Sequence, residues 1–367
     1  MHMISSLLRH FLYPSLAKSG FFYSYRNRKM SNYFTIVTYH GVLPQNYEVG
    51  DRVFDGHLVR PDVFQKQVSL LKSQYNVRPP EELNCCLERN DTLPPNSVLI
   101  TCDDGLLNNV TEMLPILKEE GLSCLFFVTA ESAKSSSSML WHEELYAMLK
   151  SAPRDPLGIP IDILGTRAKV QDGNRRREAW WKLVREFSKV GHENRQELID
   201  HLRQELGLKR DWNTFIRENP ALKKRFILLS LSDLEVLKNA GMTLGSHTFT
   251  HPILSLLPRS AAQHEIEESR NRLEQELNIQ VWALSYPFGD PASVTSREMT
   301  MAKRAGYRCA FVNSGGLVPS QMEKRFHLQR VHVSADMTIA EFEAHVSGFH
   351  GMLQKKFLHS MGVSNWI

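Results

Sequence analysis

Short apolar or β-branched runs alternate with amphipathic stretches along most of the chain, and this alternation predicts a parallel α/β fold. The first two runs, at residues 34–39 and 98–102, each end in polar residues and a glycine. Further strands are expected at residues 124–128, 242–246, 281–286, 307–312 and 328–333. Helices are expected at residues 61–75, 110–120, 232–241, 260–277, 295–306 and from 338 onward, with Ser232 and Glu235 as the capping box of one of them. About seven strands separated by helices favour a distorted (β/α)7-type barrel, and no glycine-rich phosphate loop follows any strand.

Residues 141–228 depart from this alternation because their pattern is mostly helical. We therefore predict a basic, aromatic segment at residues 1–33 and an α/β domain at 34–335 that a helical insertion at 141–228 interrupts. A C-terminal helix and tail follow at 336–367. The insertion carries arginines at 175–177 followed by Trp180 and Trp181. Charged runs on helices are usually solvated and tryptophans are usually packed, so the insertion is expected to be a lid or a partner surface without chemistry of its own.

The composition narrows the function only a little. Lys and Arg total 44 against 40 Asp and Glu, and the net charge of +4 is too small to indicate a nucleic acid partner. The five cysteines show no metal-ligand spacing, and their odd number argues against a disulfide framework. A reducing compartment is therefore expected.

The first 47 residues contain Arg9, Lys18, Arg26, Arg28 and Lys29 but no acidic residue, and aromatic side chains lie between these bases. Such a segment could bind an anionic membrane surface or form a helix packed on the domain, and the sequence leaves both interpretations open. No apolar stretch is long enough for a signal peptide or a membrane span. We therefore expect a cytoplasmic protein, with peripheral association at the inner face of the membrane as one interpretation.

The candidate catalytic residues follow the predicted strands at their carboxyl ends. His40 follows the first strand, Asp103 and Asp104 follow the second, and His247 and His251 follow the strand at 242–246. In a barrel of parallel strands these ends meet on one face, where active sites form. Two adjacent carboxylates at a buried strand end repel each other and lose hydration, so they indicate a bound cation or a chemical task.

These residue types can form a metal centre. One Asp oxygen and two His nitrogens supply three ligands and leave a position open for water, as in catalytic zinc sites. The spare carboxylate can take a proton from that water while the ion polarises a carbonyl, which predicts hydrolysis of an amide or an ester. Zinc is the expected ion, although Co²⁺, Ni²⁺ or Fe²⁺ would also accept these ligands.

Two motifs resemble those of the polysaccharide deacetylases with a NodB-type domain, carbohydrate esterase family 4. The sequence T-C-D-D-G at residues 101–105 resembles the family's T-F-D-D-G, and H-T-F-T-H at 247–251 matches its H-[ST]-x-x-H motif. The resemblance implies a NodB-like barrel in which Asp103 is the general base and Asp104, His247 and His251 are the metal ligands. It also implies that Phe288 contributes a backbone N–H to the oxyanion hole.

Three parts of the family pattern are changed. Cys102 replaces the usual Phe, which we expect to be a change in packing only. Ser285 stands where the family has the arginine that orients the base, and we expect Arg330 to replace that arginine. The motif that supplies the general acid is matched only approximately at His332. A branch resembling the poly-N-acetylglucosamine deacetylases takes the acid from a Tyr-His strand end instead. Tyr39 and His40 fit that pattern, so we favour His40 over His332 as the acid.

The resemblance thus implies a metal-dependent hydrolase that removes an acetyl group from an N-acetylated sugar of a polysaccharide or a lipid-linked glycan precursor. Two alternatives remain open. One is a deformylase or another amide hydrolase that uses the same metal centre. The other is a non-catalytic glycan-binding protein that keeps the fold, an interpretation that the missing arginine motivates.

Overall fold

The computed structural model describes residues 7–49, 51–133, 138–152, 159–163, 166–170, 174–208, 216 and 219–360. Residues 1–6 and 361–367 of the predicted terminal segments therefore lie outside the described residues.

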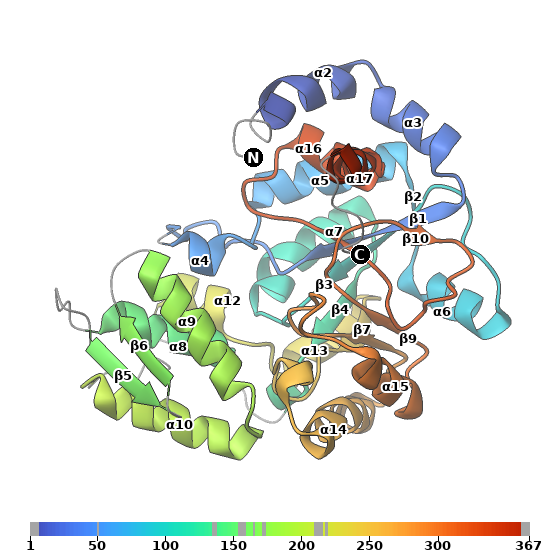
Figure 1. Cartoon of the computed structure of the whole chain (residues 1–367). Coiled ribbons are helices and arrows are strands. Elements are labelled where there is room, and N and C mark those ends of the chain that lie inside the picture. Colours follow the sequence, from blue (N-terminus) through green and yellow to red (C-terminus); the bar gives the residue numbers. More distant parts are fainter. Residues whose placement is uncertain are drawn as a thin grey trace.

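A curled parallel sheet forms the centre of the molecule (Figure 1). Its strands run in the order β1 (Tyr33–Tyr39), β3 (Ser97–Cys102), β4 (Leu125–Val128), β7 (Thr243–Ser246), β8 (Ala283–Ser285) and β9 (Cys309–Phe311). Each of these strands pairs in parallel with its neighbours. Two short strands extend the sheet beside β1 and β3, namely β10 (Val318–Pro319), which is antiparallel to β1, and β2 (Asn76–Val77), which is parallel to β3.

The last strand brings the two edges of the sheet together. β11 (Val331–His332) pairs in parallel with β1, while Leu328, just before it, forms a parallel bridge with Phe311 of β9. The chain at residues 328–332 therefore lies between the first and last strands of the path, and the sheet curls into a distorted barrel. This confirms the predicted fold class.

Helices connect the strands and cover the outside of the sheet. They are α5 (Pro61–Gln74), α6 (Pro80–Arg89), η2 and α7 (Asn109–Met113 and Leu114–Glu120), α13 (Leu231–Asn239), α14 (Arg259–Leu277), α15 (Ser296–Arg304) and α16 (Ile339–Val346). The predicted capping box at Ser232 and Glu235 is wrong, because Ser230 caps α13 and exchanges hydrogen bonds with Asp233 instead. The two boxes overlap in sequence, and only the backbone geometry at the start of the helix decides between them.

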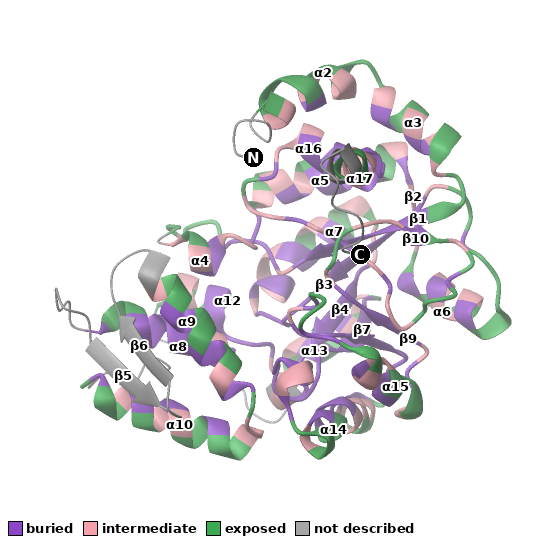
Figure 2. Ribbon diagram, in the orientation of Figure 1, coloured by how far each residue is buried: buried purple, intermediate pink, exposed green. Residues whose placement is uncertain are grey.

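The apolar faces of these helices pack on strands that are buried along almost their whole length (Figure 2). Val98 and Ile100 of β3 and Phe126 of β4 are fully buried in the main core. Continuous burial explains why these strands read as unbroken apolar runs, since helices of a parallel sheet leave no face exposed to water.

The insertion folds as a lobe beside the barrel (Figure 1). It consists of α8 (Trp141–Ser151), the hairpin β5–β6 (Ile159–Ile163 and Thr166–Val170), α9 (Asn174–Phe187), α10 (His192–Glu205) and α12 (Pro220–Phe226). A second apolar cluster holds its helices together, including Leu145, Leu183 and Leu202. Helices dominate the described part of the lobe as expected, but the hairpin was not predicted. The boundaries drawn from the sequence for the parts of the chain stay predictions.

The basic N-terminal segment is helical and packs on the C-terminal helices. η1 (Leu8–Leu12), α2 (Tyr13–Lys18) and α3 (Phe21–Lys29) lie against α16 and α17 (Phe349–Ser360). Tyr13, Phe22 and Phe349 form the buried contact between them. A packed helix is thus present, and membrane binding by its outer face stays a prediction. Among the described residues, no helix is long and apolar enough to cross a membrane.

Candidate active site

A pocket of about 450 Å³ lies where the carboxyl ends of the strands meet the insertion. The barrel contributes its polar strand-end residues to this pocket, and helices α8 and α9 of the insertion contribute one wall. The residues outside the insertion that line it are His40, Arg52, Val53, Phe54, Gly56, His57, Asp103, Asp104, His247, His251, Phe288, Asn313 and His332. Every catalytic or metal-ligating residue predicted from the sequence therefore lines one cavity.

Asp104, His247 and His251 form the cluster that could hold a metal. Their three ligand atoms lie within 4.8 Å of one another, and all three residues are buried. Asp104 Oδ1 is 3.4 Å from His247 Nε2 and 3.3 Å from His251 Nε2. Burial would raise the pKa of Asp104, but the two imidazoles hold it well below its usual range.

The tautomer of His247 shows why a cation fits among these atoms. His247 Nδ1 lies 2.7 Å from the carbonyl oxygen of Ser285, and because a carbonyl can only accept, Nδ1 carries the proton. In the neutral ring, Nε2 then points a lone pair at the Asp104 carboxylate, which is unfavourable unless a positive charge lies between them. A proton can supply this charge as well, since burial lowers the pKa of His247 but Asp103 and Asp104 raise it above its ordinary value. The three ligand atoms therefore fit a divalent metal ion.

Asp103 is held by an arginine from the far end of the barrel sequence. Arg330 is fully buried and donates from Nη1 and Nη2 to the two carboxylate oxygens of Asp103, at 2.7 and 2.6 Å. Burial would raise the pKa of Asp103, but Arg330 and His247 lower it. The carboxylate that the sequence assigns to the base is therefore held ionised and fixed in orientation, and the expected contact with Arg330 is present.

Ser285 completes this arrangement in a way that the sequence did not indicate. Its hydroxyl donates to Asp103 Oδ2 at 3.1 Å, and Arg330 Nη2 lies 2.9 Å from the same hydroxyl oxygen. A serine leaves room at this strand end for the guanidinium of Arg330, the residue just before β11. Ser285 and Arg330 therefore fit together, because the small side chain at position 285 leaves the space that the guanidinium of Arg330 occupies.

Both candidate acids line the pocket beside each other. The rings of His40 and His332 are 5.1 Å apart, and His57 lies 5.3 Å from His40 on another side. Burial, together with His40 and Arg330, lowers the pKa of His332 to about 3. His40 Nδ1 is buried without a partner among the described residues. A neutral His332 is a poor proton donor near neutral pH.

Several residues at the site have left-handed backbone conformations. Asp104, Thr248, His251 and Phe288 have φ of 75°, 66°, 61° and 61°. This conformation costs a residue with a side chain about 1–2 kcal/mol. Such strain persists where the surrounding structure fixes it, as at functional sites. The amide N–H of Phe288 donates no hydrogen bond within the described part of the chain, so it can donate to a ligand.

The insertion forms a wall of the pocket, and the sequence analysis assigned none of its residues to the site. His142, Glu143 and Tyr146 of α8 and Arg177, Trp180 and Trp181 of α9 line it. The His142 ring is 4.8 Å from that of His251, and both of its nitrogens are buried without a partner in the described structure. Arg177 is exposed and Trp180 is packed in the lobe's apolar cluster, as expected, but both also line the pocket, which was not predicted. No local pattern could reveal this, because only the docking of the insertion brings them to the strand ends.

A buried ion-pair network joins this wall to the barrel. Arg225, fully buried in α12, donates to Asp55 at 2.9 Å and to Glu143 at 2.8 Å. Burial raises the pKa of Glu143 to about 7, although Arg225 opposes the shift. The position of α8 over the site thus depends on charges that have no access to water.

Comparisons with known proteins agree with this geometry. The family model described as "Polysaccharide deacetylase" matches residues 90–204 and 215–310, more than half of the chain. No curated protein sequence matches the chain.

Solved structures of deacetylases share the fold at low sequence identity. The Streptococcus pyogenes deacetylase PplD, solved with acetate, is 17% identical with a TM-score of 0.54, covering 86% of this chain and 98% of its own. IcaB from Ammonifex degensii is 17% identical with a TM-score of 0.52, covering 86% and 97%. A de-N-acetylase from Aggregatibacter actinomycetemcomitans is 11% identical with a TM-score of 0.50, covering 85% and 99%. At these identities the likeness concerns the fold alone.

Proposed function

Because the chain belongs to the polysaccharide deacetylase family, we propose that it is a metal-dependent hydrolase that removes the acetyl group from an N-acetylated sugar. One observation carries this proposal: the buried Asp104–His247–His251 cluster lies beside a second carboxylate, Asp103, that Arg330 holds in place within the same pocket. A metal cluster beside a fixed carboxylate can supply a metal ion and a general base to the same substrate.

The chain's own residues have separate tasks in this proposal. Asp104, His247 and His251 would hold the ion, for which we propose zinc, and a bound divalent ion supplies Lewis-acid polarisation of the acetyl carbonyl and of water. Asp103 takes the proton from the attacking water, because its carboxylate is ionised and fixed by Arg330.

The remaining steps fall to the other side of the pocket. Water adds to the acetyl carbon, the free N–H of Phe288 donates to the oxygen that becomes negative, and His40 gives a proton to the sugar nitrogen as the C–N bond breaks. Acetate and a free amino sugar are the products. We assign the acid to His40 rather than His332 because burial holds the pKa of His332 at about 3.

The substrate is proposed to be a sugar at the end of a glycan or on a lipid-linked glycan precursor. The wall that α8 and α9 place over the strand ends supports this, because it narrows the site into a pocket. The Tyr39–His40 strand end favours the poly-N-acetylglucosamine deacetylase branch of the family. We also propose a cytoplasmic location, which the five free cysteines support.

Acetate release from N-acetylated sugars, measured with protein loaded with Zn²⁺ or Co²⁺, tests the function. Asp103→Asn should keep the metal but lose about 10²–10⁴-fold in kcat. Full activity in this variant would contradict the role of the base. Release of formate from an N-formylated sugar in place of acetate would favour a deformylase. Protein that binds no stoichiometric metal and releases no acid with added Zn²⁺ or Co²⁺ would favour a non-catalytic role.

A further inference from the structure

Two arginines that line the pocket have no task in the proposed reaction. Arg52 is the first residue of α4 (Arg52–Asp55), and Arg177 lies in α9 of the insertion. In Figure 1 α4 lies near one end of α9, and residues of both helices line the same pocket at the junction between barrel and insertion. We propose that they form a subsite for a phosphate group carried by the sugar substrate, an inference that rests on the proposed function.

The other charges of the pocket are already compensated. Asp103 is paired with Arg330, and Asp104 belongs to the metal cluster. Glu143 is paired with Arg225. Arg52 and Arg177, in contrast, have no ion-pair partner among the residues that the structure describes. The unpaired charge of the lining is therefore positive, and a bound divalent ion would add to it.

The nearest candidate for neutralising these arginines from within the chain is engaged elsewhere. Asp51, the residue before Arg52, caps α4 through the N–H of Val53 and accepts a hydrogen bond from the Tyr146 hydroxyl at 3.0 Å. Lys150 lies 3.5 Å from the same carboxylate. Within the described structure neither guanidinium group has an acidic partner, and both arginines line the cavity.

Phosphate is the ligand that this arrangement suits best. Guanidinium groups present paired N–H donors that match phosphate oxygens, whereas the hydroxyls of a neutral glycan have no charge to satisfy them. With a neutral polymer in the pocket, both arginines would therefore lack an anionic partner. An N-acetylated sugar with a phosphate or diphosphate on its anomeric carbon fits, whether that group leads to a nucleotide or to a lipid.

Paired substrates test the subsite in the full-length, metal-loaded protein. We expect N-acetylglucosamine 1-phosphate to have a KM about tenfold below that of the uncharged methyl glycoside. The double variant R52Q/R177Q should raise the KM of the phosphorylated sugar about tenfold more than that of the methyl glycoside. R60Q is the matched control, since Arg60 is exposed, pairs with Asp62 and lies outside the pocket lining. It should keep both wild-type KM values.

Equal KM values for the two sugars in the wild type, or equal changes in the double variant, would overturn the subsite. If neither sugar releases acetate, the proposed function fails, and calorimetric titration of N-acetylglucosamine 1-phosphate then decides the subsite alone. A dissociation constant that R52Q/R177Q leaves unchanged would overturn it, and about tenfold weaker binding would support it. Uridine-diphosphate and polyprenyl-diphosphate forms of the sugar, compared by kcat/KM, distinguish the nucleotide from the lipid source.

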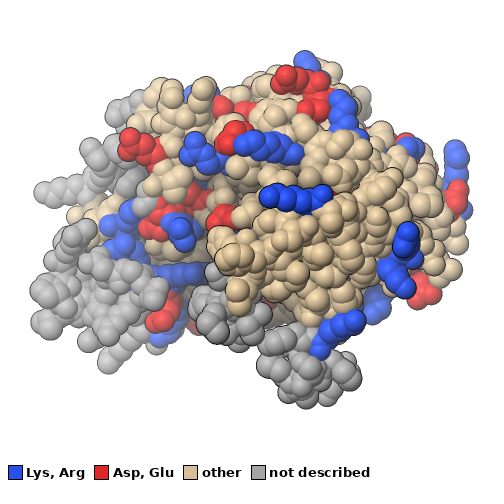
Figure 3. Space-filling view, turned by 90° about the horizontal axis from the view of Figure 1, so that it is seen from above, with Lys and Arg blue, Asp and Glu red and all other residues tan. Residues whose placement is uncertain are grey.

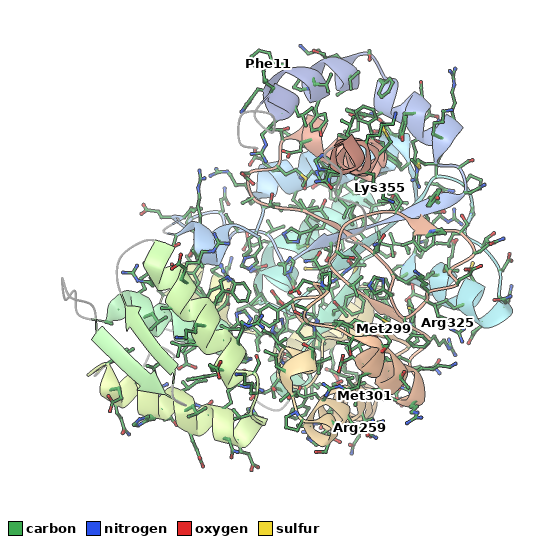
Figure 4. The ribbon with its side chains drawn as sticks, in the orientation of Figure 1. Phe11, Arg259, Met299, Met301, Arg325 and Lys355 are labelled. Carbon is green, nitrogen blue, oxygen red and sulfur yellow. The ribbon has the colours of Figure 1, made fainter. Side chains whose placement is uncertain are left out.

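A different observation concerns the outer face of the N-terminal helices. Four large side chains on η1, α2 and α3 or next to them are exposed, and we call this the N-terminal face: Leu7, Phe11, Leu12 and Tyr23. Phe11 is 68% exposed and points away from the domain in Figure 4. Half of the exposed large apolar side chains in the described structure lie in this short segment.

The free charges on the same face are basic. Arg9 is paired with Asp336 and Glu341, and Arg26 is buried. The remaining bases of the segment are exposed and have no ion-pair partner in the described structure, and α17, which contacts α3, adds two more: Lys18, Arg28, Lys29, Lys355 and Lys356. Figure 3, which looks onto this side, shows a broad uncharged area crossed by Lys and Arg side chains, with Asp and Glu toward its margins.

We also propose that the N-terminal face binds the surface of an anionic phospholipid bilayer. Exposed aliphatic and aromatic side chains enter the interface between headgroups and acyl chains, and the bases attract the negative headgroups. Neither part alone holds a protein firmly, so binding should require both and should weaken as salt screens the charges.

Cosedimentation with vesicles tests this surface independently of any activity. We expect binding to vesicles that contain about 30% anionic phosphatidylglycerol. Binding to vesicles of pure phosphatidylcholine should be about tenfold weaker. Phe11→Ser with Leu12→Ser, and separately R28Q/K29Q, should each weaken binding about fivefold or more. Val236→Ser is the matched control, because Val236 is 47% exposed on the distant helix α13. Absence of binding, or equal losses in control and test variants, would overturn the proposal.

Discussion

Replacing Arg330 by methionine is the most direct test of how the site is held together. Methionine fills much of the volume of the arginine stem but removes the guanidinium that donates to Asp103 at 2.7 and 2.6 Å and to the Ser285 hydroxyl at 2.9 Å. Asp103 would keep one weaker partner, the Ser285 hydroxyl at 3.1 Å.

The size of the effect follows from burial. Arg330 is fully buried and the Asp103 side chain is 3% exposed, so little water reaches the side of the carboxylate that the guanidinium contacts. Removing one member of such a pair leaves a buried charge without compensation and costs about 3–5 kcal/mol of unfolding free energy. Ser285→Ala removes only a neutral hydroxyl and should cost about 0.5–1.5 kcal/mol.

Catalysis should fall by a separate route. A base that is no longer fixed loses about 10²–10⁴-fold in kcat, while KM and metal content should change little because in the proposed mechanism Arg330 binds neither the substrate nor the ion. Arg330→Lys keeps the charge but cannot donate to both carboxylate oxygens in the bidentate geometry. Its kcat should therefore lie between those of the wild type and Arg330→Met. The assays are urea unfolding, metal analysis and steady-state acetate release on the same preparations.

One outcome would refute this reasoning. If Arg330→Met lost stability but its folded, metal-loaded fraction kept the wild-type kcat, Arg330 would be a structural residue only. The exchange S285R/R330S sharpens the test, since it offers a guanidinium to Asp103 from the strand end where the family motif has arginine. Partial recovery of kcat over Arg330→Ser would support a positioning role that either strand end can fill.

Three further predictions concern the metal, the insertion and pH. His251→Ala should lower metal affinity at least about 100-fold in a metal-buffered titration, because two donors remain, whereas His142→Ala should keep the metal since His142 lies outside the cluster. Arg225→Met should lower the unfolding free energy by about 3–5 kcal/mol at pH 8. Its cost should be smaller at pH 5, where Glu143, whose pKa burial raises to about 7, takes up a proton; equal cost in urea titrations at both pH values would contradict this. Burial raises the pKa of Glu343 from 4.5 to about 7, so the native state binds this proton more tightly than the unfolded state and loses stability as pH rises across that interval. Glu343→Gln should therefore raise Tm at pH 8 but not at pH 4, and a rise of equal size at both would count against the assignment.

The sequence by itself determined the local parts of this site. Asp103 and Asp104 follow an apolar strand, and His247 and His251 have a spacing that depends on a single turn after β7. These features involve neighbours a few residues apart, so strand pattern and residue chemistry were enough to predict the parallel fold and to place both motifs on one face.

Only the tertiary structure decided how the motifs are supported and what they face. Arg330 is 227 residues from Asp103 in the chain, and the contact exists because residues 328–332 close the barrel beside β1. From the sequence, Arg177 and Trp180 are predicted only to lie on a helix surface and to pack. The docking of the lobe over the strand ends is what brings them to the pocket. Local patterns report interactions between near neighbours, whereas the closure of a curled sheet and the docking of an insertion depend on packing between distant segments, which no short window of sequence contains.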